Sequence, residues 1–94
     1  MYYVYILFSK KLSSFYIGET NTVEERITQH NTGFYKDAYT SKTNDWQLYL
    51  SIECYNRSQA RRIETHIKKM KSKKYIENLK IFPELISKLL DKFS

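Results

Sequence analysis

The N-terminal stretch YYVYILFSKKLSSFYIGET, residues 2–20, decides the fold. Residues 2–8 are apolar at every position, which is typical of a strand covered on both faces and therefore of the centre of a sheet. The polar run 9–14 predicts a turn, and residues 14–18 predict a second short strand. The stretch thus predicts a hairpin with a loop of about six residues, rich in tyrosine.

The segment after this hairpin predicts a helix and a third strand. A polar residue among 20–22 can cap the helix, Val23 and Ile27 are four apart, and Gly33 ends it. Residues 34–45 have no clear period and predict a loop. Residues 46–55 alternate as a strand does, which puts four side chains on one face: Leu48, Leu50, Ile52 and Cys54.

The rest of the chain predicts helices. Residues 58–71 form one, with Ser58 as a plausible cap and an apolar stripe made of Ala60, Ile63, Ile67 and Met70. Residues 73–79 predict a further short helix, and Pro83 suits the first turn of a last helix. The predicted fold class is α/β (α+β): a small three-stranded antiparallel sheet flanked by helices, in the order β-β-α-β-α-(α)-α.

Composition and charge narrow the class of protein. The 94 residues are enough for one domain, and the single cysteine, Cys54, fits a reducing compartment. There is no apolar run of about 18 residues and no signal-peptide pattern, so we expect a cytoplasmic protein without a membrane span. The net charge of +6 indicates a polyanionic partner, first nucleic acid and second an anionic membrane surface.

Two tyrosines of the hairpin are predicted to be neighbours. Tyr3, Tyr5 and Leu7 share one face of the first strand, and Tyr16 and Gly18 share one face of the second. Tyr5 and Tyr16 therefore lie side by side across the hairpin. Ordinary cross-strand aromatic packing would explain this pair equally well.

A cation and an imidazole are predicted on the helix that follows. Arg26 and His30 are four residues apart, beside the stripe formed by Val23 and Ile27, near the end of the second strand. Arginine suits phosphate recognition, and histidine can move protons near neutral pH. The alternative is a pair of solvated surface residues.

The helix after the third strand is strongly basic. From Arg57 to Lys74 there are eight Lys or Arg residues and one carboxylate, Glu64, at the edge of the apolar stripe. Glu64 can pair with Lys68 at the favoured spacing of four. Alternatively it can hold a hard divalent cation over a basic surface, since Mg²⁺ often takes only one or two carboxylates.

Taken together, these residues resemble the GIY-YIG nuclease family, in particular its small single-domain bacterial branch. The two tyrosine motifs match as VYI (residues 4–6, with Val4 where the family name has glycine) and YIG (residues 16–18). Other matching strings are QHNTG, AYTSK and RSQARRIETHIKKMK. The resemblance covers about residues 1–79, which we expect to form the nuclease-like domain, with residues 80–94 as a C-terminal helix packed on it.

The resemblance implies a divalent-metal-dependent DNA endonuclease with Mg²⁺ or Mn²⁺ held by Glu64, and no small-molecule cofactor. Gly18 would keep the strand end open for backbone approach, and which tyrosine is the base stays open. The implied catalytic residues are Tyr5, Tyr16, Arg26, His30 and Glu64; the motif positions are Val4, Ile6, Ile17 and Gly18. The implied nucleic-acid contacts are Tyr39, Thr40, Lys42, Arg57, Arg61, Lys68 and Lys71.

Three hypotheses for the function agree with these observations. The first is an endonuclease with little sequence specificity, because we expect no appended domain of the kind that supplies sequence choice in larger family members. Single-stranded, branched and damaged DNA are all open as substrates. The second is a non-catalytic nucleic-acid-binding module with the same fold. The third is an interaction protein whose basic surface meets an acidic partner. DNA repair, DNA uptake and defence against foreign DNA are all compatible settings.

Overall fold

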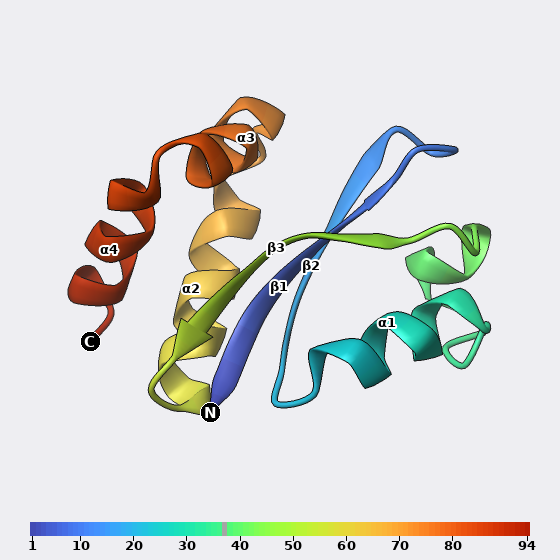
Figure 1. The fold of residues 1–94 in the computed structure, drawn as a ribbon, viewed down its shortest axis with the longest axis horizontal. Coiled ribbons are helices and arrows are strands. Elements are labelled where there is room, and N and C mark those ends of the chain that lie inside the picture. Colours follow the sequence, from blue (N-terminus) through green and yellow to red (C-terminus); the bar gives the residue numbers. More distant parts are fainter. Residues whose placement is uncertain (37) are drawn as a thin grey trace.

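The first strand of the predicted hairpin is the centre of the sheet. In the computed structural model, which describes residues 1–36 and 38–94, β1 (Tyr2–Ser9) pairs antiparallel with both β2 (Ser14–Thr20) and β3 (Gln47–Cys54). The strand order is β2-β1-β3, so β2 is an edge strand (Figure 1). The predicted three-stranded antiparallel sheet is confirmed.

In the described residues four α-helices accompany the sheet, and the predicted short helix is one of them. The element order β-β-α-β-α-α-α confirms the predicted α+β class, with a 3₁₀ turn, η1 (Tyr39–Lys42), before β3. In the described part of the chain, none of the helices is long and apolar enough to cross a membrane. The helices are α1 (Val23–Asn31), α2 (Arg57–Met70), α3 (Lys73–Ile81) and α4 (Pro83–Lys92).

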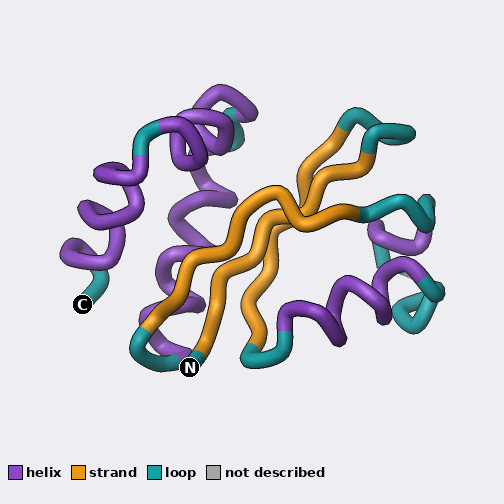
Figure 2. The backbone as a smooth tube through the Cα atoms, viewed as in Figure 1, coloured by secondary structure: helices purple, strands orange, loops and turns teal. Residues whose placement is uncertain are grey.

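The helices cover opposite faces of the sheet, as Figure 2 shows. Successive side chains of β1 point to alternate faces. Val4 and Ile6 belong to the main core with residues of α2, α3 and α4, whereas Tyr5 and Leu7 pack with Trp46 and the apolar stripe of α1. Burial on both faces explains why the sequence of β1 is apolar throughout.

The ends of α2 differ from the sequence prediction. Asn56, not Ser58, is the N-cap, and its side chain accepts a hydrogen bond of 2.9 Å from the backbone N–H of Gln59. Lys71 ends the helix in the left-handed conformation, with φ 47°. Met70, expected in the buried stripe, is 44% exposed because it lies in the last turn, beyond the sheet-facing part of the helix.

A β-bulge corrects the expected face of Leu48. The register of β1 against β3 shifts between Ile6, opposite Leu50, and Leu7, opposite Leu48, so Tyr49 is the extra residue. Tyr49 packs against the main core beside Leu50, and Leu48 moves to the face of Tyr5 and Leu7. The alternation seen in the sequence therefore holds only from Leu50 onward.

The hairpin loop is shorter than predicted and is held by Asp45, a residue from the predicted loop. The Asp45 carboxylate accepts hydrogen bonds from Ser9 Oγ (2.6 Å), Thr43 Oγ1 (2.6 Å) and the backbone N–H of Lys11 (3.0 Å). These bonds, that of Ser9 first, hold the pKa of Asp45 well below its usual range. The clamp fixes the start of β3 against the end of β1.

The C-terminal segment packs on the same core as the rest of the chain. Leu89 of α4 is buried in the main core, and Gln59 Nε2 of α2 donates a hydrogen bond of 3.1 Å to the backbone oxygen of Leu90. The division into a nuclease-like domain over residues 1–79 and a helix over 80–94 packed on it stays a prediction.

Candidate active site

Tyr5 is placed at the middle of the sheet, where its ring is 1% exposed. Its partner across the hairpin is Gly18, and a Cβ on Gly18 would lie only 2.5 Å from Cζ of Tyr5. The Tyr5 ring thus fills the space over the glycine. This corrects the expectation that Gly18 keeps the strand end open: glycine is needed here because the aromatic ring occupies the position of a side chain.

A buried hydrogen-bond chain joins Tyr5 to the second residue of the predicted Arg26–His30 pair. The Tyr5 hydroxyl lies 3.0 Å from Nε2 of His30, and Nδ1 of His30 lies 2.7 Å from Oγ1 of Thr40. His30 is 3% exposed, so it is not a solvated surface residue. Figure 1 shows that α1, the helix that carries His30, lies on the side of the sheet away from α2.

The environment keeps Tyr5 and His30 neutral. Burial raises the pKa of Tyr5 well above its usual range, and the nearby Arg26 guanidinium only partly offsets this. Burial, followed by the charge of Arg26, lowers the pKa of His30. A neutral imidazole carries one N–H, so in this chain one ring nitrogen of His30 donates a hydrogen bond and the other accepts one.

Tyr16 reaches the rim of the same cluster. It lies diagonally across the hairpin from Tyr5, with ring centroids 6.4 Å apart and the planes tilted by 41°. Its ring meets that of His30 edge-on, at a centroid distance of 5.0 Å. Unlike Tyr5, Tyr16 is only half-buried. The two tyrosines therefore differ in their access to water.

Arg26 lies one helical turn before His30 and faces the same cluster. It influences the pKa of both Tyr5 and His30, and its Cζ lies 5.8 Å from the centroid of the Tyr35 ring. Four of the five predicted catalytic residues thus gather on the α1 face of the sheet. The exposed end of the arrangement is a cation beside a phenol, a combination suited to a phosphate and a water molecule.

Glu64 belongs to the other side of the sheet. Its side chain is 17% exposed and forms an ion pair of 2.7 Å with Lys68 Nζ, the spacing of four that the sequence suggested. Among the described residues, no hydrogen bond or ion pair connects Glu64 with the tyrosine cluster. The helix that carries it packs against β2, the edge strand that also carries Tyr16.

The donor set around Glu64 fits a magnesium site completed by the substrate. Within residues 1–36 and 38–94, no three metal-ligating side chains gather. A half-buried carboxylate is nevertheless a hard oxygen donor, and Mg²⁺ commonly keeps several waters and takes phosphate oxygens beside one or two carboxylates. Lys68 would have to release the carboxylate for the ion to bind.

The predicted nucleic-acid contacts divide into three groups. Thr40 is fully buried and bonds His30, so it cannot contact a strand and this prediction is corrected. Tyr39 and Lys42 are exposed, with Lys42 Nζ 5.0 Å from the Tyr39 ring centroid. The third group lies on α2 or directly after it. Arg57, Arg61 and Lys68 share the Glu64 face at spacings of three and four, and Lys71 is the left-handed residue that ends the helix.

The residues that hold Thr40, the hydrogen-bond partner of His30, were not predicted from the sequence. Trp46, which is 2% exposed, donates a hydrogen bond of 2.9 Å from Nε1 to the backbone oxygen of Thr40. Asn31 in turn bonds both the backbone N–H and the backbone oxygen of Trp46. The signal was that Trp46 is the single tryptophan of the chain, placed at the end of a polar loop.

The fold and this cluster define a nuclease-type catalytic domain. The chain matches the GIY-YIG catalytic domain over residues 1–76, which is most of its length, and it belongs to the GIY-YIG family. No curated protein and no solved structure matches it. GIY-YIG domains are generally nucleases that use divalent metals, and a nuclease domain implies a DNA substrate.

Proposed function

We propose that the protein is a metal-dependent DNA endonuclease with little sequence specificity, acting in the cytoplasm. The observation that carries the proposal is the difference between the two tyrosines. Tyr5 is buried and locked to His30, whereas Tyr16, a few ångströms away, reaches the surface next to them. One tyrosine is therefore a support, and the other is available to the substrate.

The reaction is in-line hydrolysis of a phosphodiester bond. Tyr16 acts as the general base that takes a proton from the water attacking the phosphorus. Arg26 holds a non-bridging oxygen while negative charge gathers on it. The bond to the 3′ oxygen breaks, and the 3′ oxygen takes a proton from solvent, which leaves a 5′-phosphate and a 3′-hydroxyl. Tyr5, His30 and Thr40 position Tyr16 and do not exchange protons with the substrate.

Glu64 would hold Mg²⁺ or Mn²⁺. The ion, when bound, would neutralise charge on the phosphate and on the leaving oxygen. The half-buried position of Glu64 over β2 and the single-carboxylate donor set support this assignment. Its basic neighbours on α2 would attract the DNA backbone without regard to sequence, so binding should weaken steeply with salt.

A cleavage assay with a charge-matched control tests the proposal. Labelled single-stranded, duplex and forked DNA are incubated with the protein in Mg²⁺, Mn²⁺ or EDTA. We expect cleavage only with metal, and loss of cleavage in Glu64→Gln. Glu77→Gln, an exposed carboxylate on α3, removes the same charge and should cleave as wild type does. Equal cleavage by the wild type and Glu64→Gln would refute the metal assignment.

One observation favours a non-catalytic binding module as the second candidate. Lys68 Nζ lies 2.7 Å from the Glu64 carboxylate and balances its charge, so the carboxylate needs no metal ion. The module would bind DNA in EDTA and in Mg²⁺ alike, without cutting it. Tight binding by wild type, with no metal-dependent product on any of the three DNA forms, would establish this candidate.

A further inference from the structure

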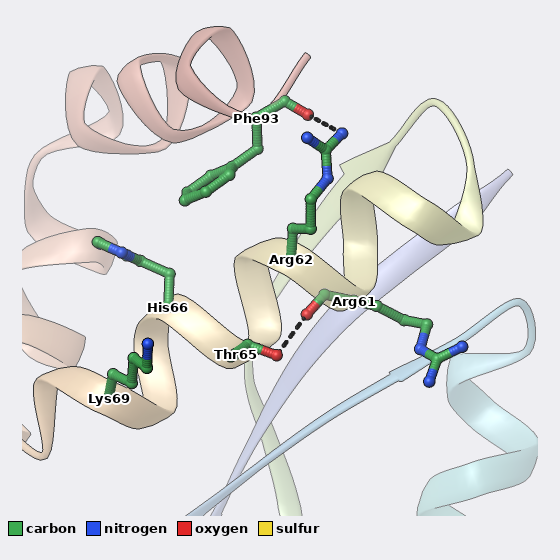
Figure 3. Close-up of a pocket in the computed structure, with 6 residues that line it drawn as sticks. All are labelled: Arg61, Arg62, Thr65, His66, Lys69 and Phe93. Atoms are coloured by element: carbon green, nitrogen blue, oxygen red, sulfur yellow. Dashed lines mark hydrogen bonds between the residues drawn. The ribbon is translucent and has the colours of Figure 1, made fainter.

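A second basic surface lies on α2, around the helix from the Glu64 face. It is a groove of about 340 Å³ between α2 and the segment that follows α4 (Figure 3). Five of its lining side chains come from α2 and the sixth follows α4. They are Arg61, Arg62, Thr65, His66, Lys69 and Phe93.

The groove concentrates positive charge that the protein does not neutralise. Arg62 and Lys69 are the cations whose side chains lie with Phe93 and His66, whereas the Arg61 side chain points away from them (Figure 3), and none of the lining residues is a carboxylate. The ion pairs found among the described residues are Arg57–Glu19 and Lys68–Glu64, so Arg61, Arg62 and Lys69 have no acidic partner there. Clustered unpaired cations repel one another, which makes such a site favourable for an anion.

The local chemistry of His66 agrees with this positive field. Burial lowers the pKa of the imidazole first, and the charges of Lys92 and Lys69 lower it further. The ammonium of Lys92 also lies 5.5 Å from the centroid of the Phe93 ring. A further cation thus stands at the α4 side of the groove, and the ring lies among the charges.

The groove also presents a braced aromatic platform. Phe93 is half-buried, and its ring centroid lies 5.4 Å from that of His66. A guanidinium nitrogen of Arg62 donates a hydrogen bond of 2.8 Å to the backbone oxygen of Phe93, which ties the segment after α4 to α2. Figure 3 shows the Phe93 ring between the side chains of Arg62 and His66.

An aromatic ring among unpaired cations is the combination by which proteins hold unpaired nucleotides: bases stack on the ring, and cations meet the phosphates. We propose that this groove binds a single-stranded segment of nucleic acid, with one base on Phe93, the flanking phosphates at Arg62 and Lys69, and Arg61 meeting the strand outside the groove on the Glu64 side. A duplex would not suffice, because its bases are already stacked inside the helix. An acidic peptide would use the cations and leave the ring unused.

The position of the groove extends the Glu64 face. Arg61 lines the groove and also lies on the stripe that contains Arg57, Glu64 and Lys68. A strand held near Glu64 can therefore pass over Arg61 into the groove. If the proposed nuclease function holds, the substrate is DNA with a single-stranded portion next to the cleaved bond. Binding in the groove itself requires no catalysis.

Fluorescence anisotropy in EDTA separates binding from cleavage. The probes are a labelled oligothymidylate and a duplex of the same length, titrated at several salt concentrations. Phe93→Leu should weaken single-strand binding about five-fold or more and leave duplex binding unchanged. Lys69→Glu should weaken it about ten-fold and make the salt dependence shallower by about 0.7 in log–log slope.

Matched controls decide between a site and a general charge effect. Lys88→Glu makes the same charge change on an exposed part of α4, and Phe82→Leu makes the same apolar change on a ring outside the groove. Both should bind as wild type does. Thermal unfolding verifies that each variant is folded, and Phe93→Tyr, which keeps a stacking ring, should retain binding.

Two results would overturn the proposal. One is that Lys69→Glu and Lys88→Glu weaken single-strand binding equally. The other is that Phe93→Leu leaves single-strand binding unchanged or weakens duplex binding to the same extent. Either result, with metal-dependent cleavage intact, would remove the groove and leave the nuclease function. Binding that follows the groove predictions, without any cleavage, would do the reverse.

Discussion

Gly18→Ala should destabilise the protein because Tyr5 occupies the space that a side chain needs. The added Cβ would lie 2.5 Å from Cζ of Tyr5, where ordinary van der Waals contact begins at 3.4 Å, so the ring must move by about 0.9 Å. The ring is 1% exposed, and its hydroxyl is bonded to His30, so no open space receives it.

The expected loss in the free energy of unfolding is about 2 kcal/mol. Overpacking of a buried site costs about 1–3 kcal/mol, and a stretched Tyr5–His30 bond adds about 1 kcal/mol. Replacing glycine also restricts the unfolded chain, which stabilises the folded state by about 0.4–1 kcal/mol. This gain applies here because Gly18 does not have a positive φ. For a chain of this size, the melting temperature should fall by about 8–16 °C.

A double-mutant cycle in urea tests the reasoning. In a Tyr5→Leu background the ring is gone, so adding Gly18→Ala should cost less than about 0.5 kcal/mol. Gly33→Ala is the control: its φ is +75° with open space around it, so its cost is backbone strain and should be the same in both backgrounds. A Gly18→Ala penalty that persists without the Tyr5 ring would refute the packing argument.

Three further changes test the supports of the site. Asn31→Ala removes two hydrogen bonds to the backbone of Trp46 and should cost about 1–3 kcal/mol in urea unfolding, with cleavage reduced in proportion to the folded fraction; a neutral effect would contradict the support role. Asp45→Asn should make the free energy of unfolding depend less on pH in acid. The pKa of Asp45 is depressed in the folded protein, so its contribution to stability is present above the unfolded pKa of 3.8 and is lost as the pH falls. An unchanged curve of stability against pH would contradict this. Gln59→Ala should loosen α4, seen as faster amide exchange around Leu90, whose backbone oxygen accepts from Gln59; unchanged exchange there would contradict it.

The sequence determined the positions of the two tyrosines because strand periodicity and a short loop leave few registers. The register that pairs Tyr5 with Gly18 puts Tyr5 and Tyr16 on one face, and a slip by one residue would have separated them. The basic face around Glu64 could be predicted in the same way, because side chains three and four residues apart share a face of a single helix. Both predictions depended on local geometry.

The features that were missed depend on tertiary contacts. The burial of His30 requires Thr40 and Trp46, which come from a loop without a period, and no spacing rule places them under α1. The bulge at Tyr49 reverses the face of Leu48 although the sequence alternates smoothly. The asymmetry between the tyrosines follows from these same contacts, and so it emerged only from the structure.

The most direct test of the account compares Tyr16→Phe with Tyr5→Phe in single-turnover cleavage of forked DNA in Mg²⁺. Tyr16→Phe should keep wild-type stability and lose at least about 100-fold in rate, as expected for removal of a general base. Tyr5→Phe should lose about 1–3 kcal/mol of stability, because it leaves His30 without its partner, and retain measurable cleavage. Wild-type cleavage by Tyr16→Phe, with activity abolished in folded Tyr5→Phe, would contradict the assignment.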